Sequence, residues 1–82
     1  EAVPTDLATE VTQSLAVPTI GIGAGPGCDG QVLVTPDMLG ITCFEAKYIK
    51  RYAELSSIMQ RAAELFVSDV KEKRFPTPEQ GY

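Results

Sequence analysis

Apolar side chains recur at helical spacing near the start of the chain. They stand four residues apart at Leu7, Val11 and Leu15, which places them on one face of a helix. Pro4 suits the first turn of that helix, because its missing N–H leaves no hydrogen bond unmade there. We therefore predict a helix over residues 4–15.

A short β-branched run follows. Residues 17–22 are mostly apolar and lead directly into glycine. A run without polar alternation is typical of a buried strand in a parallel sheet. We predict a loop over residues 23–31, which contain two turn dipeptides. Residues 31–39 are ambiguous, and we predict only a short helical turn near Asp37.

The clearest pattern lies between residues 47 and 73. Its apolar positions step by three or four residues: Tyr48, Tyr52, Leu55, Met59, Ala62, Phe66 and Val70. This spacing predicts a long amphipathic helix, which Pro76 and Pro78 end. Because no sustained heptad charge pattern accompanies it, we expect the apolar face to pack against a core or a subunit. Tyr48 and Tyr52 are interpreted as members of this face and not as acid–base groups.

The order of elements is helix, strand, glycine-rich loop and long helix, which is an α/β arrangement. A chain of 82 residues allows at most one small domain. Its single strand and two helices leave their apolar faces without partners. We therefore expect one partial domain, with a helix, strand and rim loop in residues 1–46 and the long helix and tail in residues 47–82.

The net charge and the composition argue against some classes of binding partner. The net charge of −4 argues against nucleic acid and anionic membranes. No apolar run reaches 18 residues, so no membrane span is expected. All seven basic residues lie in residues 47–74, interleaved with acidic ones, as on a solvated helix face. Cys28 and Cys43 lack metal-ligand spacing. A single disulfide between them is one reading, and two free thiols in a reducing compartment, in keeping with the absence of a signal peptide, is the favoured one. We expect the cytoplasm, with mitochondria as the alternative.

The glycine-rich stretch contains Gly21 near the end of the predicted strand and Gly23 and Gly25 directly after it. A dinucleotide-binding loop would open a helix at its third glycine, and a P-loop would carry a lysine followed by Ser or Thr. Pro26 delays any helix, and no lysine precedes Lys47. The residues alone leave a phosphate site, a tight turn and the rim of a larger active site open, with the turn favoured.

Three carboxylates are candidates for chemistry. Glu1 stands three residues before Pro4, where a strand would lead into the first helix. In an α/β barrel that position belongs to the catalytic face, so Glu1 is either a general base or a solvated carboxylate. Asp29 and Asp37 could each bind a metal or cap a turn. Neither has a partner at ligand spacing, which favours capping.

Several of these motifs occur together in a known family. "EAVPTDLATEVTQSLAVPTIGIGAGPGCDGQVLVTPDMLG", then "KYIKRYAEL" and "RFPTPEQGY", resemble the C-terminal part of ketopantoate hydroxymethyltransferase over essentially the whole chain. The resemblance implies a (β/α)8 TIM barrel that forms a homo-oligomer. Residues 1–4 would be the exit of strand seven, residues 4–15 helix seven and residues 17–22 strand eight. A barrel needs ~250 residues, so the earlier part of the barrel is an expected partner.

The resemblance also implies a reaction. A hydroxymethyl group passes from 5,10-methylenetetrahydrofolate to 3-methyl-2-oxobutanoate and gives 2-dehydropantoate, in pantothenate biosynthesis. Mg2+ acts as a Lewis acid on the oxo acid, and a carboxylate base removes the proton beside the carbonyl. Glu1 matches the family's glutamate in its E-x-V-P motif and is the expected base. The metal ligands lie on earlier strands, so no metal site is expected in this chain.

Two further expectations follow from the resemblance. Gly21, Gly23 and Gly25 would form a rim loop beside the substrate without binding phosphate, and the isolated chain would be inactive. The tail departs from the family's "FP-x-x-E-H-S-F", because the chain has glutamine and glycine after Glu79. The alternative function is a non-catalytic module that binds an anion or packs between subunits.

Overall fold

Helix α1 (Thr5–Ser14) opens the computed structural model, which describes residues 1–82. It begins directly after Pro4, whose carbonyl accepts the first helical hydrogen bond from the Ala8 amide at 2.9 Å. Asp6 lies in the first turn, where its charge complements the positive end of the helix dipole. The predicted first helix is confirmed to within one residue at each end.

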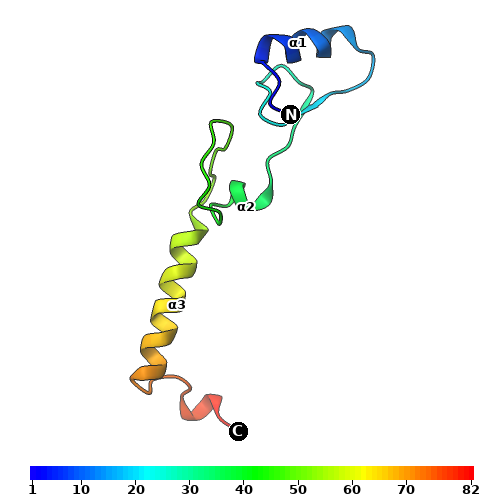
Figure 1. Cartoon of the computed structure of the whole chain (residues 1–82). Coiled ribbons are helices and arrows are strands. Elements are labelled where there is room, and N and C mark those ends of the chain that lie inside the picture. The colour runs from blue at the N-terminus through cyan, green and yellow to red at the C-terminus, as the bar shows by residue number, and fades with distance from the viewer.

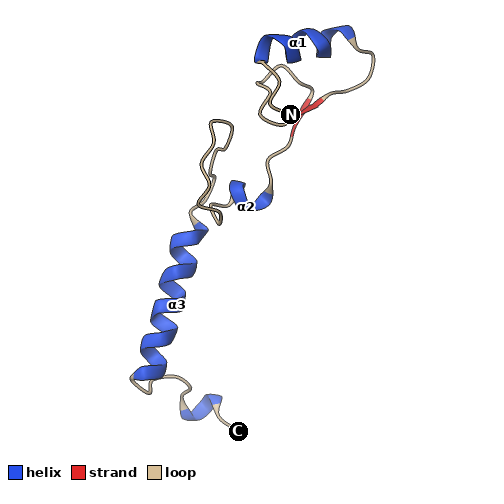
Figure 2. Cartoon of the chain, in the orientation of Figure 1, coloured by secondary structure: helices blue, strands red, loops and turns tan.

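Two short strands follow α1 and pair in parallel. Strand β1 (Ile20–Gly21) and strand β2 (Gly30–Gln31) pair in the register Ile20 with Gly30 and Gly21 with Gln31. Figure 2 shows this pair close to the N-terminus. The predicted strand over residues 17–22 was too long. One cause is visible at Thr19, whose amide donates to the Asp29 carboxylate at 2.8 Å.

Strand β2 lies inside the segment predicted as loop, so that prediction was wrong at its C-terminal end. The strand is two residues long and begins with glycine, and it therefore has no alternation that a sequence pattern could reveal. The amides of Gly30 and Val32 donate to the carbonyls of Thr19 and Gly21, both at 2.9 Å. The predicted helical turn near Asp37 is confirmed as α2 (Thr35–Met38).

Helix α3 (Leu55–Lys71) is shorter than predicted at its N-terminal end, and a 3-10 turn, η1 (Pro78–Gln80), closes the chain. The prediction that a helix begins at residue 47 was wrong. The amides of Tyr52 and Leu55 donate to the carbonyls of Met38 and Leu39 at 2.8 and 3.0 Å. Contacts with α2 and the residue after it therefore replace the local hydrogen bonds that a continuous helix would need.

The three parts of the chain lie one after another along a single long axis. Figure 1 shows α1 and the strands at one end, α2 with a neighbouring loop in the middle, and α3 projecting away from both. The radius of gyration is 21.4 Å and the extents are 67 × 25 × 14 Å, whereas a compact chain of this length has a radius of about 12 Å. The apolar core consists of Ala8 and Ala24 alone. No helix has the length and apolar character needed to cross a membrane.

Candidate functional site

The glycine loop, residues 21–27, is the point where three segments meet. A Cβ atom on Gly21 would lie 2.9 Å from Cys28 Sγ, and one on Gly25 would lie 2.6 Å from Thr5 Cγ2 at the start of α1. A Cβ atom on Gly23 would lie 3.0 Å from Cγ of the Tyr48 ring. Gly23 and Gly25 also have φ angles of +61° and +81°, which side chains other than glycine rarely adopt. Close packing and backbone conformation therefore both require glycine here.

Glu1 lies beside this loop. The amide of Ala2 donates to the carbonyl of Ile22 at 2.9 Å, which holds the first residues of the chain alongside the end of β1. Glu1 lines one end of a hollow of about 320 Å3 between the apolar face of α1 and β1. Its carboxylate makes no hydrogen bond or ion pair within the structure. Ala2 has a φ angle of +53°, so a strained backbone adjoins the candidate base.

The two candidate aspartates have structural partners. Asp29 Oδ2 accepts hydrogen bonds from the amide and the hydroxyl of Thr19, at 2.8 and 3.3 Å. Asp37 lies in the first turn of α2 and accepts a 2.5 Å hydrogen bond from the hydroxyl of Thr42. Each carboxylate therefore links two segments of the chain, and neither bond is the predicted turn cap, because Thr19 lies ten residues from Asp29 and α2 has no side-chain cap bond.

The described residues do not provide a metal site. Nowhere in residues 1–82 do three or more His, Cys, Asp or Glu side chains gather closely enough to hold a metal ion. The chain by itself therefore offers no ligand set for the Mg2+ that the family resemblance implies for an intact enzyme. Cys28 and Cys43 are both unpaired.

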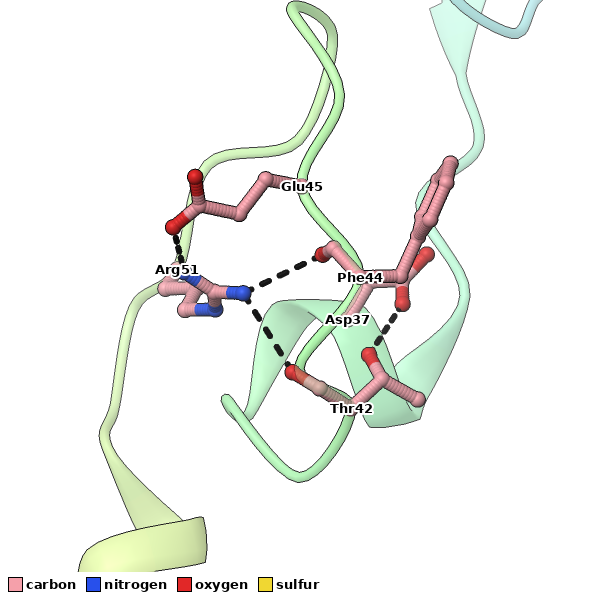
Figure 3. Close-up of polar contacts among 5 residues, drawn as sticks. All are labelled: Asp37, Thr42, Phe44, Glu45 and Arg51. Atoms are coloured by element: carbon pink, nitrogen blue, oxygen red, sulfur yellow. Dashed lines mark hydrogen bonds and ion pairs between the residues drawn. The ribbon is translucent and has the colours of Figure 1, made fainter.

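The 42–51 loop is closed at its base by Arg51. The guanidinium donates from Nη2 to the carbonyl oxygens of Thr42 and Phe44, at 3.3 and 3.1 Å, and from Nη1 to Glu45 Oε1 at 3.3 Å. Figure 3 shows the guanidinium directed at these three acceptors, with the hydrogen bond between Asp37 and Thr42 beside them. The Arg51 side chain is 24% exposed, so the charged hydrogen bonds form in a partly shielded place and hold the loop closed.

The 42–51 loop places Tyr48 and two lysines at the glycine loop. Tyr48 was interpreted as part of the helix face, and that interpretation was wrong, because its ring lies over Gly23. Lys47 and Tyr48 line a hollow of about 390 Å3 together with residues 2–5. Neither residue was among the predicted site residues. No local signal distinguishes them, since the stretch lacks glycine and proline and continues the helical spacing.

Comparison with known proteins assigns the family. The family model described as ketopantoate hydroxymethyltransferase matches residues 1–78. Proteins named 3-methyl-2-oxobutanoate hydroxymethyltransferase from Chlorobaculum parvum and Caulobacter vibrioides are each 52% identical to the whole chain. One from Acaryochloris marina is 51% identical over 93% of it. The chain spans about 30% of the length of these curated relatives. With nearly all of its length matched, the chain belongs to the ketopantoate hydroxymethyltransferase family and corresponds to the C-terminal part of its members.

Proposed function

We propose that the chain forms the last part of a (β/α)8 barrel enzyme. In this proposal the enzyme transfers a hydroxymethyl group from 5,10-methylenetetrahydrofolate to 3-methyl-2-oxobutanoate and yields 2-dehydropantoate for pantothenate biosynthesis. The relatives are named for this oxo acid and this transfer. The barrel, the folate and the step assigned to Glu1 are our inference for this chain.

The observation that carries the proposal is the position of Glu1 beside the end of β1. The bond from Ala2 to Ile22 brings two segments together that are separated by α1, as neighbouring strands of a barrel would be. Active sites of such barrels lie at the carboxyl ends of the strands. Glu1 and the glycine loop both occupy that edge, which supports a site shared between them.

Glu1 would act as the general base. A carboxylate can remove the proton from the carbon beside the oxo group, and the resulting enolate then bonds to the one-carbon unit. Over the reaction both C–N bonds between that carbon and the folate break, water supplies the hydroxyl group, and tetrahydrofolate leaves. The hollow of about 320 Å3 that Glu1 lines is mostly apolar, with Leu7 and Ile20 among its walls. An apolar wall suits the branched carbon chain of the oxo acid. Any Mg2+ would be bound by residues outside this chain.

The partners proposed for the chain are the earlier barrel strands and further copies of the enzyme. Every residue of α3 is at least partly exposed, including the large side chains of Ile58, Leu65 and Phe66. Exposed apolar surface of this extent is typical of protein interfaces. The proposal therefore places α3 against the rest of the barrel or against another subunit.

The test is Glu1→Gln in the full-length enzyme that contains residues 1–82. We expect kcat to fall about 10²- to 10⁴-fold, the range of general base catalysis. Exchange of the oxo acid's C3 proton for deuterium, followed by NMR without folate, should fall in parallel. Glu10→Gln is the matched control, because Glu10 is exposed on α1 and undergoes the same chemical change.

Two outcomes would contradict the proposal at different points. Rapid proton exchange in the Glu1→Gln enzyme would show that another group is the base. An unmodified enzyme that neither exchanges the proton nor forms 2-dehydropantoate would refute the proposed reaction itself.

A further inference from the structure

Tyr48 lines two hollows beside the glycine loop. The first, of about 390 Å3, lies between residues 2–5 and Lys47. The second, of about 460 Å3, extends toward β2 and is lined by Lys50 and Tyr52. Gly23, Gly25 and Tyr48 line both hollows. We call the combined surface the tyrosine groove.

The charged side chains that line the groove are all positive, namely Lys47 and Lys50. None of the residues that line either hollow is acidic. Lys47 forms no ion pair, and the Lys50 ammonium lies 4.9 Å from the centre of the Tyr52 ring. Residues 1–46 contain no lysine or arginine, so the 42–51 loop brings the first two cations of the chain, Lys47 and Lys50, to a surface that otherwise has none.

The floor of the groove adds unused donors. The backbone amides of Gly23 and Gly25, two residues that line both hollows, donate to no group in the protein. The carbonyl of Gly25 accepts a 2.9 Å hydrogen bond from Gln31 Nε2, which holds the loop against β2. Free amides, cations and aromatic rings together are the set of groups that recognises a flat aromatic molecule with carboxylates.

The base of the 42–51 loop keeps these groups in place. Arg51 links both ends of the loop through hydrogen bonds to two carbonyls and an ion pair with Glu45. A loop fixed at its base loses less entropy when a ligand binds at its tip. The arrangement therefore fits a binding surface that is formed before the ligand arrives.

We propose that the tyrosine groove binds the aminobenzoyl-glutamate part of the folate co-substrate. The inference rests on the proposed function for the identity of the ligand, while the groove's chemistry comes from this chain. The aromatic ring would lie along Tyr48, and Lys47 and Lys50 would bind the glutamate carboxylates. The small oxo acid stays on the Glu1 side, in the apolar hollow.

The first experiment replaces both lysines in the full-length enzyme that contains residues 1–82. In Lys47→Ala/Lys50→Ala we expect the KM for 5,10-methylenetetrahydrofolate to rise roughly five- to tenfold, as two exposed ion pairs allow. The rise should be larger for the triglutamate form and smaller in high salt. The KM for the oxo acid and the rate of deuterium exchange should stay unchanged. Arg61→Ala/Lys71→Ala removes the same charge from α3 and should change none of these values.

Binding measured without turnover separates this inference from the proposed reaction. Calorimetric titration with 5-formyltetrahydrofolate should give a weaker Kd for the double variant than for the unmodified enzyme. Tyr48→Phe should keep the affinity and Tyr48→Ala should lose it. Equal affinity in the double variant would overturn the groove assignment even if the enzyme is active. A rise in the KM for the oxo acid alone would overturn it too, because the lysines would then bind the other substrate.

Discussion

Gly23 shows how one residue can serve both the backbone and a neighbouring loop. Its φ angle of +61° lies in the left-handed region, and the Tyr48 ring occupies the place of a side chain. Any larger residue would strain the turn and move the Tyr48 ring, which lines the tyrosine groove. The role predicted from the family, a rim beside the substrate, is untested and can be examined at this position.

Gly23→Val should impair the enzyme more than it impairs the fold. We expect at least a tenfold loss of kcat/KM for the folate, while the melting temperature falls by a few degrees, since a strained φ costs about 1–3 kcal/mol. Gly30→Ala is the control, because a Cβ there meets only Ile20 Cγ1, at 3.7 Å, and its φ is not in the left-handed region. Equal losses of activity and stability in Gly23→Val would show that the residue has a packing role alone.

At the scale of elements, the sequence pattern located the helices better than it located the strands or the site. The first helix and the turn at Asp37 follow from local spacing and from proline, and both were predicted. The start of α3 could not be predicted from local spacing, because the amides of Tyr52, Leu55 and Ser56 donate to carbonyls in residues 38–40. These contacts are distant in sequence and override a local preference for helix. Glu1 and the glycines were predicted as site residues from motifs and stay a prediction, whereas Lys47 and Tyr48 lie beside the glycine loop only because the chain folds back there.

The large apolar side chains exposed on α3 should be needed for assembly of the full-length enzyme. Leu65→Glu places a charge among the exposed apolar side chains of α3, where Leu65 is now 51% exposed. Burial of a leucine contributes about 2 kcal/mol, so the dissociation constant of the assembly should rise about 30-fold or more. Ser57→Glu adds the same charge on the polar side of α3 and should leave it unchanged. Sedimentation velocity over a concentration series would distinguish them, and identical profiles would exclude α3 from the interface.

At the scale of the whole molecule, the chain shows the geometry of a part and not of an independent domain. Its two core residues are both alanines, and large apolar side chains are exposed from Leu7 to Phe75. A helix of 10 residues such as α1 is only marginally stable in water without packing. The conformational entropy of ordering 82 residues has almost no buried apolar surface to oppose it.

An isolated peptide of residues 1–82 should therefore fail to fold cooperatively. We expect weak helical circular dichroism that declines gradually with urea, without a sigmoidal transition, because each element loses its contacts independently. Mixing the peptide with the separately produced remainder of the enzyme should raise the helical signal above the sum of the two parts and restore deuterium exchange. The Leu65→Glu peptide is the matched control and should restore less. A sharp urea transition in the monomeric peptide alone would show that the chain is an independent domain, and the barrel proposal would then lose its structural basis.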